Sequence, residues 1–315
     1  MEPGVVLAVE TRGGMPEVFH LGHAVLLRPD GTVERSWGDP LAPTFWRSSA
    51  KPLQAVPFAR HRKRLGLTSA AVAVACASHT GEGHHLEAAQ AILDAIGLGE
   101  ESLLCGTHGP WGKHSVFTAN DARPLHNNCS GCHAGMLAAC VAEGWDTATY
   151  FRLDHPLQRQ LLALAEEASG FRPDVAIDGC GAPTYRTPLV GLARAFQWLH
   201  RSEPAVLDAM AEHPRLIGGT DEFDTDLLQA TRGRVVGKYG ALAVYGAVDR
   251  RTGAAVAVRV TTANEAVCDA VAGRIMLAAG LLGDAASDPA VTRHLELPVL
   301  NALGTAVGET EFRVP

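Results

Sequence analysis

β-prone runs near both ends of the chain predict antiparallel strands. Residues 18–27 and 32–37 form one pair of such runs, joined by the turn sequence Arg28-Pro29-Asp30-Gly31. Residues 234–248 and 254–262 form a second pair, joined across residues 249–253. If both hairpins join the same sheet, its strands come from the two ends of the chain.

Helical periodicity dominates the middle of the chain and one segment near its end. The predicted helices cover residues 85–96, 156–169, 204–213 and 263–282. Gly97 and Gly170 stop the first two, and Asp154 precedes the second. This arrangement favours an α+β class, an antiparallel sheet with a mostly helical middle, over a doubly wound sheet. Because no repeat or linker interrupts the pattern, residues 1–315 are predicted to form one domain, which could be divided into two lobes.

Composition and charge restrict the partners. Hydrophobic residues make up 47% and charged residues 19% of the chain, as in ordinary globular proteins. A formal charge of −7 disfavours nucleic acid as a partner, because phosphate binding needs a basic surface. No cationic start leads into a long apolar run, and no apolar segment is long enough to cross a bilayer. We therefore expect a cytoplasmic protein with a small-molecule substrate.

Ser48 and Lys51 form a Ser-x-x-Lys pattern that suits nucleophilic catalysis. If Ser48 opens a helix, Lys51 lies on the same face and its amine can reach the serine oxygen. A lysine whose pKa is lowered by desolvation can act as a base for such a hydroxyl. Pro52 is compatible with this interpretation if the helix begins near Ala50. By itself, however, the pattern more often marks an N-cap serine beside a surface lysine.

Two later segments strengthen the catalytic interpretation. Ser78 opens a Ser-led triplet, and Lys238 lies in a β-prone run within a Lys-x-Gly element. Ser-x-x-Lys, a Ser-led triplet and Lys-x-Gly follow one another in this order in penicillin-recognising serine acyltransferases. In those proteins the second serine and lysine assist proton movement and hold the substrate carboxylate. The alternatives are a polar turn residue for Ser78 and a solvated strand residue for Lys238.

Three of the seven cysteines have the spacing of metal ligands. Cys129 and Cys132 form a C-x-x-C pair, and Cys180 follows Asp178 in a glycine-rich turn. Three thiolates with a nearby carboxylate or imidazole suit a tetrahedral zinc site. A redox pair and buried unreactive thiols are the alternatives. The other four cysteines have apolar or small neighbours and are predicted to lie in the core: Cys76, Cys105, Cys140 and Cys268.

Five segments taken together resemble one family, the Rhizobium-type or class 3 L-asparaginases. The resemblance runs from about Val5 to the last strands. It implies a fold like that of serine β-lactamases and glutaminases, and a homodimer. The segments, in chain order, are Arg47-Ser48-Ser49-Ala50-Lys51-Pro52, Cys76-Ala77-Ser78-His79, Asn128-Cys129-Ser130-Gly131-Cys132-His133-Ala134-Gly135-Met136-Leu137, Asp178-Gly179-Cys180-Gly181-Ala182-Pro183 and Gly237-Lys238-Tyr239-Gly240.

The resemblance also implies roles for the four serine and lysine residues. Ser48 is the implied nucleophile, with Lys51 as its base. Ser78 and Lys238 form a second pair that relays protons or positions the substrate. The implied reaction is hydrolysis of L-asparagine to L-aspartate and ammonia. Glutamine or another small amide as substrate, a penicillin-type acyl-serine enzyme, and a zinc-stabilised amino-acid-binding protein are the alternatives.

The implied zinc site departs from the family at one position. The ligand positions are Cys129, Cys132 and Cys180, with Asp178 close by, but the family has lysine where this chain has Cys132. Because a thiolate is softer than an amine and carries negative charge, we expect tighter zinc binding and a more negative site. The alternative is a lost metal site, with Cys129 and Cys132 forming a reversible disulfide.

Three further residues beside these motifs are candidates for contacts with ligands or substrate. His79 and His133 flank the motif residues and could orient a ligand, although turn or packing roles suit them equally. Arg47 could pair with a substrate carboxylate.

Overall fold

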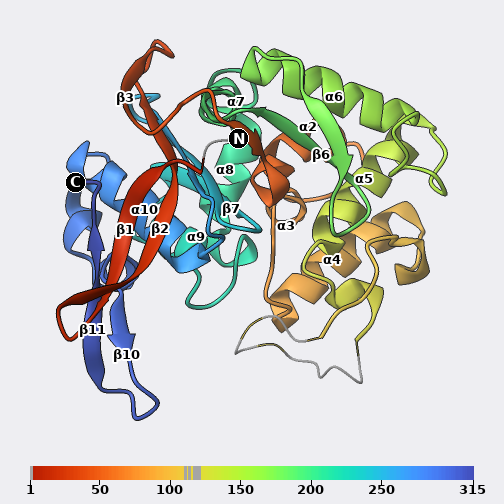
Figure 1. Cartoon of the computed structure of the whole chain (residues 1–315). Coiled ribbons are helices and arrows are strands. Elements are labelled where there is room, and N and C mark those ends of the chain that lie inside the picture. Colours follow the sequence, from red (N-terminus) through yellow and green to blue (C-terminus); the bar gives the residue numbers. More distant parts are fainter. Residues whose placement is uncertain (1–2, 110–111, 113–114, 116–121) are drawn as a thin grey trace.

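An eight-stranded antiparallel sheet forms one side of the molecule (Figure 1). The computed structural model describes residues 3–109, 112, 115 and 122–315. The strand order is β10-β11-β1-β2-β9-β8-β7, and β3 also pairs with β2. N-terminal and C-terminal strands therefore share one sheet, as predicted. The strands are β1 (Val5–Arg12), β2 (Met15–Leu27), β3 (Val33–Trp37), β7 (Val235–Gly240), β8 (Val244–Asp249), β9 (Ala255–Val260), β10 (Pro298–Leu300) and β11 (Ala306–Phe312).

Helices cover both faces of this sheet. On one face Phe196 of α7 approaches the backbone of β8 so closely that a Cβ at Gly246 would lie 2.4 Å from its ring. On the other face Val271 and Ile275 of α10 pack into an apolar cluster with Val256 of β9. Burial on both faces explains why β8 and β9 are almost continuously apolar. These helices are α7 (Leu189–Ser202), α8 (Pro204–Glu212), α9 (Phe223–Ala230), α10 (Glu265–Ala278) and α11 (Pro289–Leu295).

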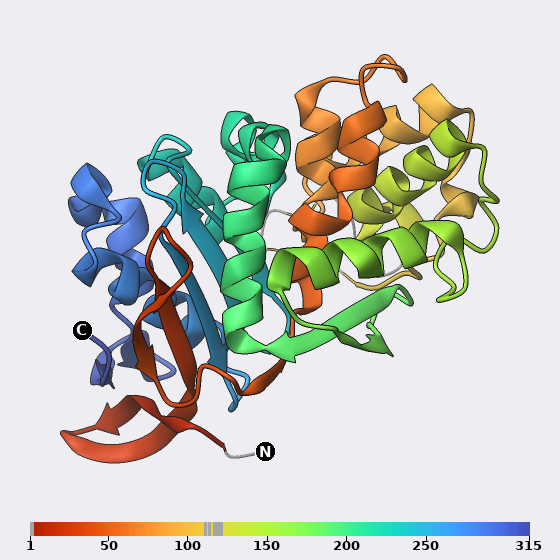
Figure 2. The same cartoon turned by 90° about the horizontal axis from the view of Figure 1, so that it is seen from above.

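A helical region and a small sheet lie beside the large sheet (Figure 2). The small sheet has the order β4-β6-β5, with β4 (Pro43–Phe45), β5 (Asp174–Ile177) and β6 (Pro183–Pro188). The helices are α1 (Lys51–Gln54), α2 (Val56–His61), α3 (Ser69–Ala75), α4 (Gly83–Ile96), α5 (Ser130–Glu143) and α6 (Pro156–Ser169). Short 3₁₀ turns connect elements: η1 (Arg47–Ala50), η2 (Glu100–Ser102), η4 (Pro124–His126), η5 (Pro214–Leu216) and η6 (Gly283–Ser287).

Two glycines allow α5 to pack very closely against α3. A Cβ at Gly131 would lie 2.3 Å from the carbonyl oxygen of Val74, and one at Gly135 would lie 2.8 Å from the Cβ of Ala75. Such distances are shorter than real carbon contacts, so only glycine fits at either position. This contact brings the start of α5, with its cysteines, next to the end of α3.

The predicted α+β class is confirmed, and most differences concern element boundaries. Residues 234–248, expected as one run, form β7 and β8, because Leu242 and Ala243 adopt positive φ and turn the chain. The helix predicted over 263–282 is shorter, since Asn264 caps α10 through its side chain. His155 rather than Asp154 caps α6. No helix within the described residues is long and apolar enough to cross a membrane.

Candidate active site

Ser48 and Lys51 lie where the turn η1 passes into α1. The backbone N–H of Lys51, the first residue of α1, donates to the carbonyl oxygen of Ser48. Pro52 follows within the first turn, where its missing N–H costs no hydrogen bond, as predicted. Arg47, directly before Ser48, has a φ of 50°, a left-handed conformation that is uncommon outside glycine. The predicted nucleophile thus follows a residue with an unusual backbone conformation.

Lys51 is buried, and its ammonium group contacts acceptors from other parts of the chain. Nζ donates to the carbonyl oxygen of Ala77 at 2.6 Å and to Oγ of Ser78 at 3.0 Å. It also donates to Sγ of Cys129 at 3.2 Å. The hydrogen bonds of the described residues therefore join Lys51 to Ser78 rather than to Ser48, because the long side chain extends from α1 to the segment that follows α3.

The pKa of Lys51 differs from the prediction, which was a desolvated lysine with a lowered pKa that acts as a base. Burial lowers the pKa of Lys51, but its interactions with the Cys129, Cys132 and Cys180 sulfurs when these are ionised, Cys129 foremost, outweigh burial and leave the pKa above its ordinary value. A hydrogen bond from Cys180, together with the charge of Lys51, lowers the pKa of Cys129 to about 6 against the effect of burial. The cluster therefore holds a thiolate beside a lysine ammonium at neutral pH.

The three predicted zinc ligands fit a metal ion only in part. Cys129 and Cys180 are in hydrogen-bond contact, so two sulfurs converge as zinc requires. Cys132 instead donates to Oε1 of Gln54 at 3.7 Å, and burial raises its pKa to about 12. All seven cysteines are free thiols, and the four that were predicted to lie in the core are buried.

The described residues contain one group of three potential metal ligands within 4.8 Å of one another, and it is not the cysteine cluster. The group consists of Glu82, His84 and His85 at the start of α4. Nδ1 of His85 accepts the backbone N–H of Glu82 at 3.1 Å, and its Nε2 lies 2.8 Å from the carbonyl oxygen of Arg215. Since both ring nitrogens of His85 are engaged, the group caps the helix rather than binding a metal.

Arg47, a predicted substrate contact, forms an ion pair with Asp178, which was expected close to the zinc ligands. Nη2 of Arg47 lies 2.8 Å from Oδ1 of Asp178, and the two side chains are 25% and 15% exposed. The pair joins the turn that holds Ser48 to the turn that holds Cys180. It therefore positions these two segments relative to each other.

The two predicted histidines lie in the core. Nε2 of His79 hydrogen-bonds to Oγ of Ser130 at 2.9 Å, and burial lowers the pKa of His79 well below its ordinary value. Nδ1 of His133 lies 2.5 Å from the hydroxyl of Tyr150, and burial lowers the pKa of His133 to about 3. Both rings are neutral at pH 7 and fully buried. These contacts correspond to the packing roles that the sequence left open.

Lys238 forms a buried ion pair that the sequence did not reveal. Its Nζ lies 2.8 Å from Oδ2 of Asp224, and the two side chains are 1% and 4% exposed. Nζ also donates to the carbonyl oxygen of Tyr239 at 2.9 Å. The hydrogen bonds of the described residues thus join Lys238 to the start of α9 rather than to Ser78, the partner that was expected.

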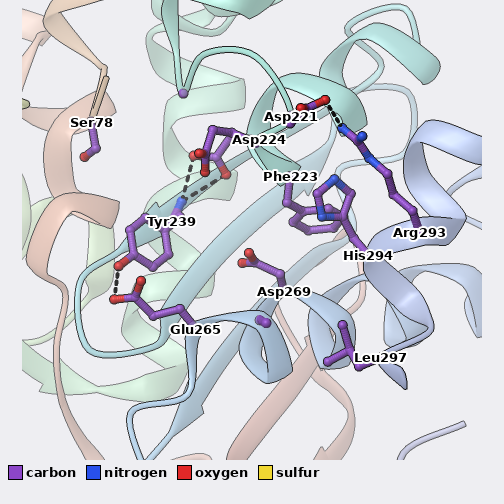
Figure 3. A pocket seen from close by; sticks show the side chains of 13 residues that line it. Ser78, Asp221, Phe223, Asp224, Tyr239, Glu265, Asp269, Arg293, His294 and Leu297 are labelled. Atoms are coloured by element: carbon purple, nitrogen blue, oxygen red, sulfur yellow. Dashed lines mark hydrogen bonds and ion pairs between the residues drawn. The ribbon is translucent and has the colours of Figure 1, made fainter. Parts of the chain in front are cut away.

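A pocket of about 280 Å³ lies beside Ser78, on the side of Lys238 and Asp224 (Figure 3). Ser78 lines it from the helical region, and Asp224 lines it from the start of α9. Glu265 and Asp269 of α10 line it as well. These pocket-lining carboxylates were not predicted from the sequence. The one signal available was the i, i+4 spacing of Glu265 and Asp269 on a predicted helix, which places two carboxylates on one face.

The comparison with known families defines the class of the protein. Residues 8–312 match the family described as L-asparaginase II, so the chain belongs to that family and is an amidohydrolase enzyme that acts on asparagine. The family resemblance predicted from the motifs is confirmed. No curated protein sequence matches the chain significantly.

Solved structures that are similar to the chain include two from bacteria. A β-lactamase from Mycobacterium bovis is 14% identical, with 87% of this chain and 95% of that chain covered and a TM-score of 0.36. An inferred β-lactamase from Bacteroides dorei is 13% identical, with 79% and 91% covered and a TM-score of 0.44. The α+β assignment rests on the strands and helices of the chain itself.

Proposed function

We propose that the chain hydrolyses L-asparagine to L-aspartate and ammonia by a serine–lysine mechanism. The observation that supports it is the position of Lys51, a buried lysine whose Nζ lies 3.0 Å from Oγ of Ser78 and which follows Ser48 at the start of α1. Two hydroxyls and one amine from different elements provide the nucleophile and the proton carrier that acyl transfer needs. The membership of the L-asparaginase II family supplies the substrate.

In the proposed reaction Ser48 attacks the side-chain amide carbon of asparagine. The Lys51 ammonium passes one proton through Ser78 to the amide nitrogen and takes up the hydroxyl proton of Ser48 in its place, and the nitrogen leaves as ammonia when the C–N bond breaks. Water then attacks the acyl-serine ester, releases aspartate and returns the proton to the serine oxygen. The hydrogen bond between Lys51 and Ser78 supports a relay role for both groups.

We further propose that zinc binds at the cysteine cluster. Cys129 and Cys180 would hold the ion, and Cys132 is the third thiol of the same cluster. Zinc supplies a Lewis acid that can hold a substrate oxygen. A homodimer and a cytoplasmic location remain predictions from the sequence.

Ammonia release from asparagine and glutamine by matched serine variants tests the mechanism. We expect Ser48→Ala to lose at least about a thousandfold in kcat, as nucleophile removal does in other serine hydrolases. Ser78→Ala should also lose activity, whereas Ser202→Ala, at an exposed serine at the end of α7, should match the wild type. Zinc content is measured on the same samples and on Cys129→Ser, where we expect it to fall.

Each part of the proposal has its own contrary result. Wild-type protein that releases no ammonia from asparagine would overturn the substrate and reaction. Full activity of Ser48→Ala with an inactive Ser78→Ala would move the nucleophile to Ser78. Wild-type protein that is active but contains no zinc would contradict the proposed zinc site. Equal zinc content in wild type and Cys132→Lys, which restores the family residue, would remove our account of tighter binding at Cys132.

A further inference from the structure

The pocket beside Ser78 contains more carboxylates than cations can balance. Five acidic side chains line it. Among the described lining residues, one is a lysine or arginine, namely Arg293. Nη2 of Arg293 lies 2.9 Å from Asp221 and 2.6 Å from Asp226, so its charge is already shared between two carboxylates. The five acids are Asp221, Glu222, Asp224, Glu265 and Asp269.

Among the residues that the structure describes, Asp269 forms no ion pair. Lys238 balances Asp224, as described above, and Glu265 accepts a hydrogen bond from the hydroxyl of Tyr239. Oδ1 of Asp269 is shielded from solvent and has no hydrogen-bond partner among the described residues. An unpartnered buried carboxylate oxygen costs folding free energy, so its presence in a pocket suggests that a ligand supplies the donor.

Asp269 is well placed to receive such a ligand. Figure 3 shows its carboxylate directed into the pocket between Tyr239 and Phe223, while Ser78 lies at the other side. Burial and the nearby charges of Asp224 and Glu222 raise the pKa of Asp269 well above its ordinary value. A positively charged ligand group in the pocket would therefore stabilise the ionised form of Asp269.

The geometry favours an organic cation over a metal ion. A metal ion needs three or more ligand atoms around one point, at about 2.0–2.6 Å. Among the described residues the carboxylates of this pocket form no group of three whose ligand atoms lie within 4.8 Å of one another. A primary ammonium group, by contrast, has three N–H donors that point in different directions and can use separated acceptors.

We propose that this pocket binds the α-ammonium group of the amino-acid amide, with Asp269 as its main acceptor. The inference rests on the proposed function, since it assumes that the amide group of the same molecule is at the serines. It assigns to Asp269 the selection of substrates that carry an amine beside the reacting side chain. Substrates that lack the α-ammonium group make no such contact with Asp269 and gain no binding free energy from it.

Kinetics with two substrates test this role. Succinamate has the structure of asparagine with the α-ammonium replaced by hydrogen. For Asp269→Asn we expect kcat/KM for L-asparagine to fall about tenfold or more, the usual effect of losing a hydrogen bond to a charged group. We expect kcat/KM for succinamate to stay within about twofold of wild type. Asp154→Asn, at an exposed carboxylate before α6, is the matched control.

The pattern across substrates decides the outcome. Equal losses for both substrates would mean a structural role for Asp269, and no loss for either would mean that the amine binds elsewhere; each overturns the proposal. Titration calorimetry with L-aspartate and succinate measures binding affinity in the pocket without requiring turnover. Wild type should bind L-aspartate more tightly than succinate, and Asp269→Asn should lose that difference.

The two assays separate this proposal from the proposed function. If wild type releases no ammonia from asparagine but binds L-aspartate more tightly than succinate in an Asp269-dependent manner, the hydrolytic function fails and the ammonium site stands. If wild type hydrolyses asparagine but binds the two ligands equally, the function stands and the ammonium site fails.

Discussion

At the scale of single residues, two buried lysines differ in how their charge is balanced. Lys51 is held by a carbonyl, a hydroxyl and a sulfur, whereas Lys238 is held by the carboxylate of Asp224. The sequence predicted Ser48 with Lys51 and Ser78 with Lys238 as pairs, and these pairs stay predictions; it did not reveal the hydrogen bonds from Lys51 to Ser78 and from Lys238 to Asp224, because spacing along the chain reveals only local partners. Ser48 and Lys51 are three residues apart, yet the long lysine side chain reaches Ser78.

Removing one partner of the Lys238–Asp224 pair should be strongly destabilising. In Asp224→Ala the lysine ammonium would remain buried without its counter-charge, so we expect a loss of about 3–5 kcal/mol in the free energy of unfolding. Urea denaturation followed by circular dichroism measures the change. Asp208→Ala, which breaks the exposed pair with Arg250, should cost less than about 1 kcal/mol. Similar losses for both variants would contradict the account.

The cysteine cluster shows what sequence patterns can and cannot predict for a site. The C-x-x-C spacing and the third thiol at Cys180 predicted a zinc site, which stays a prediction; the structure shows that all three thiols lie close enough to Lys51 to affect its pKa. The contact between Cys132 and Gln54 could not be foreseen. It depends on the distance between α1 and α5, which the packing of the whole helical region determines.

At the scale of elements, the close contact between α3 and α5 sets the geometry of the site. Gly131 follows Cys129 by two residues and lies against the last turn of α3, and Ser78 follows three residues after that helix. Any residue larger than glycine at position 131 must push the two helices apart. The cysteines at the start of α5 would then move away from Ser78, which follows α3.

We expect Gly131→Ala to lower both stability and activity. The added Cβ would meet the carbonyl oxygen of Val74 at 2.3 Å, and overpacking of this kind costs about 1–3 kcal/mol. Thermal unfolding and ammonia release from asparagine measure the two effects. Gly83→Ala, where nothing lies within 4 Å of the added Cβ, is the control and should retain wild-type values. Unchanged activity in Gly131→Ala would show that the helix spacing does not set the site.

Several amphipathic helices were predicted from the sequence, whereas the buried helix α5 and the half-exposed strand β11 were not. In α4, α6 and α8 the polar and apolar residues lie on opposite faces of the helix. The sequence around the ends of these helices also carries clear stop signals. Helix α5 is buried along residues 130–140 on every side, so it shows no helical periodicity. Strand β11 is half exposed and contains Gly308 and two glutamates, so it lacks the composition of a strand. It forms because β1 and β10 provide its hydrogen-bond partners.

At the scale of the whole molecule, Glu82 links the helical region to the segment before α9. Its Oε1 accepts the backbone N–H of Thr220 at 2.6 Å, and Arg215 lies 3.4 Å from its Oε2. Burial alone would raise the pKa of Glu82, but hydrogen bonds from Thr220 and Thr80 outweigh it and lower the pKa to about 2. A carboxylate with a lowered pKa stabilises the fold above its ordinary pKa and loses this effect as pH falls toward 2.

Acid unfolding should therefore distinguish wild type from Glu82→Gln. At pH 7 we expect the variant to be less stable by about 1–3 kcal/mol. The difference should shrink as pH falls from about 4.5 toward 2, because the wild-type carboxyl becomes protonated over that range. Urea denaturation at several pH values measures it. A difference that stays constant with pH would assign the effect to side-chain shape rather than charge.

The two edges of the large sheet have a consequence for self-association. At one edge β10 has only three residues and begins with Pro298, which has no N–H to donate. At the other edge Oγ of Ser49 donates to the carbonyl oxygen of Lys238, so η1 occupies part of the outer side of β7. Neither of these two strands offers a long row of free backbone groups to a strand from another copy. Two copies of this chain would consequently not extend the sheet through β10 or β7.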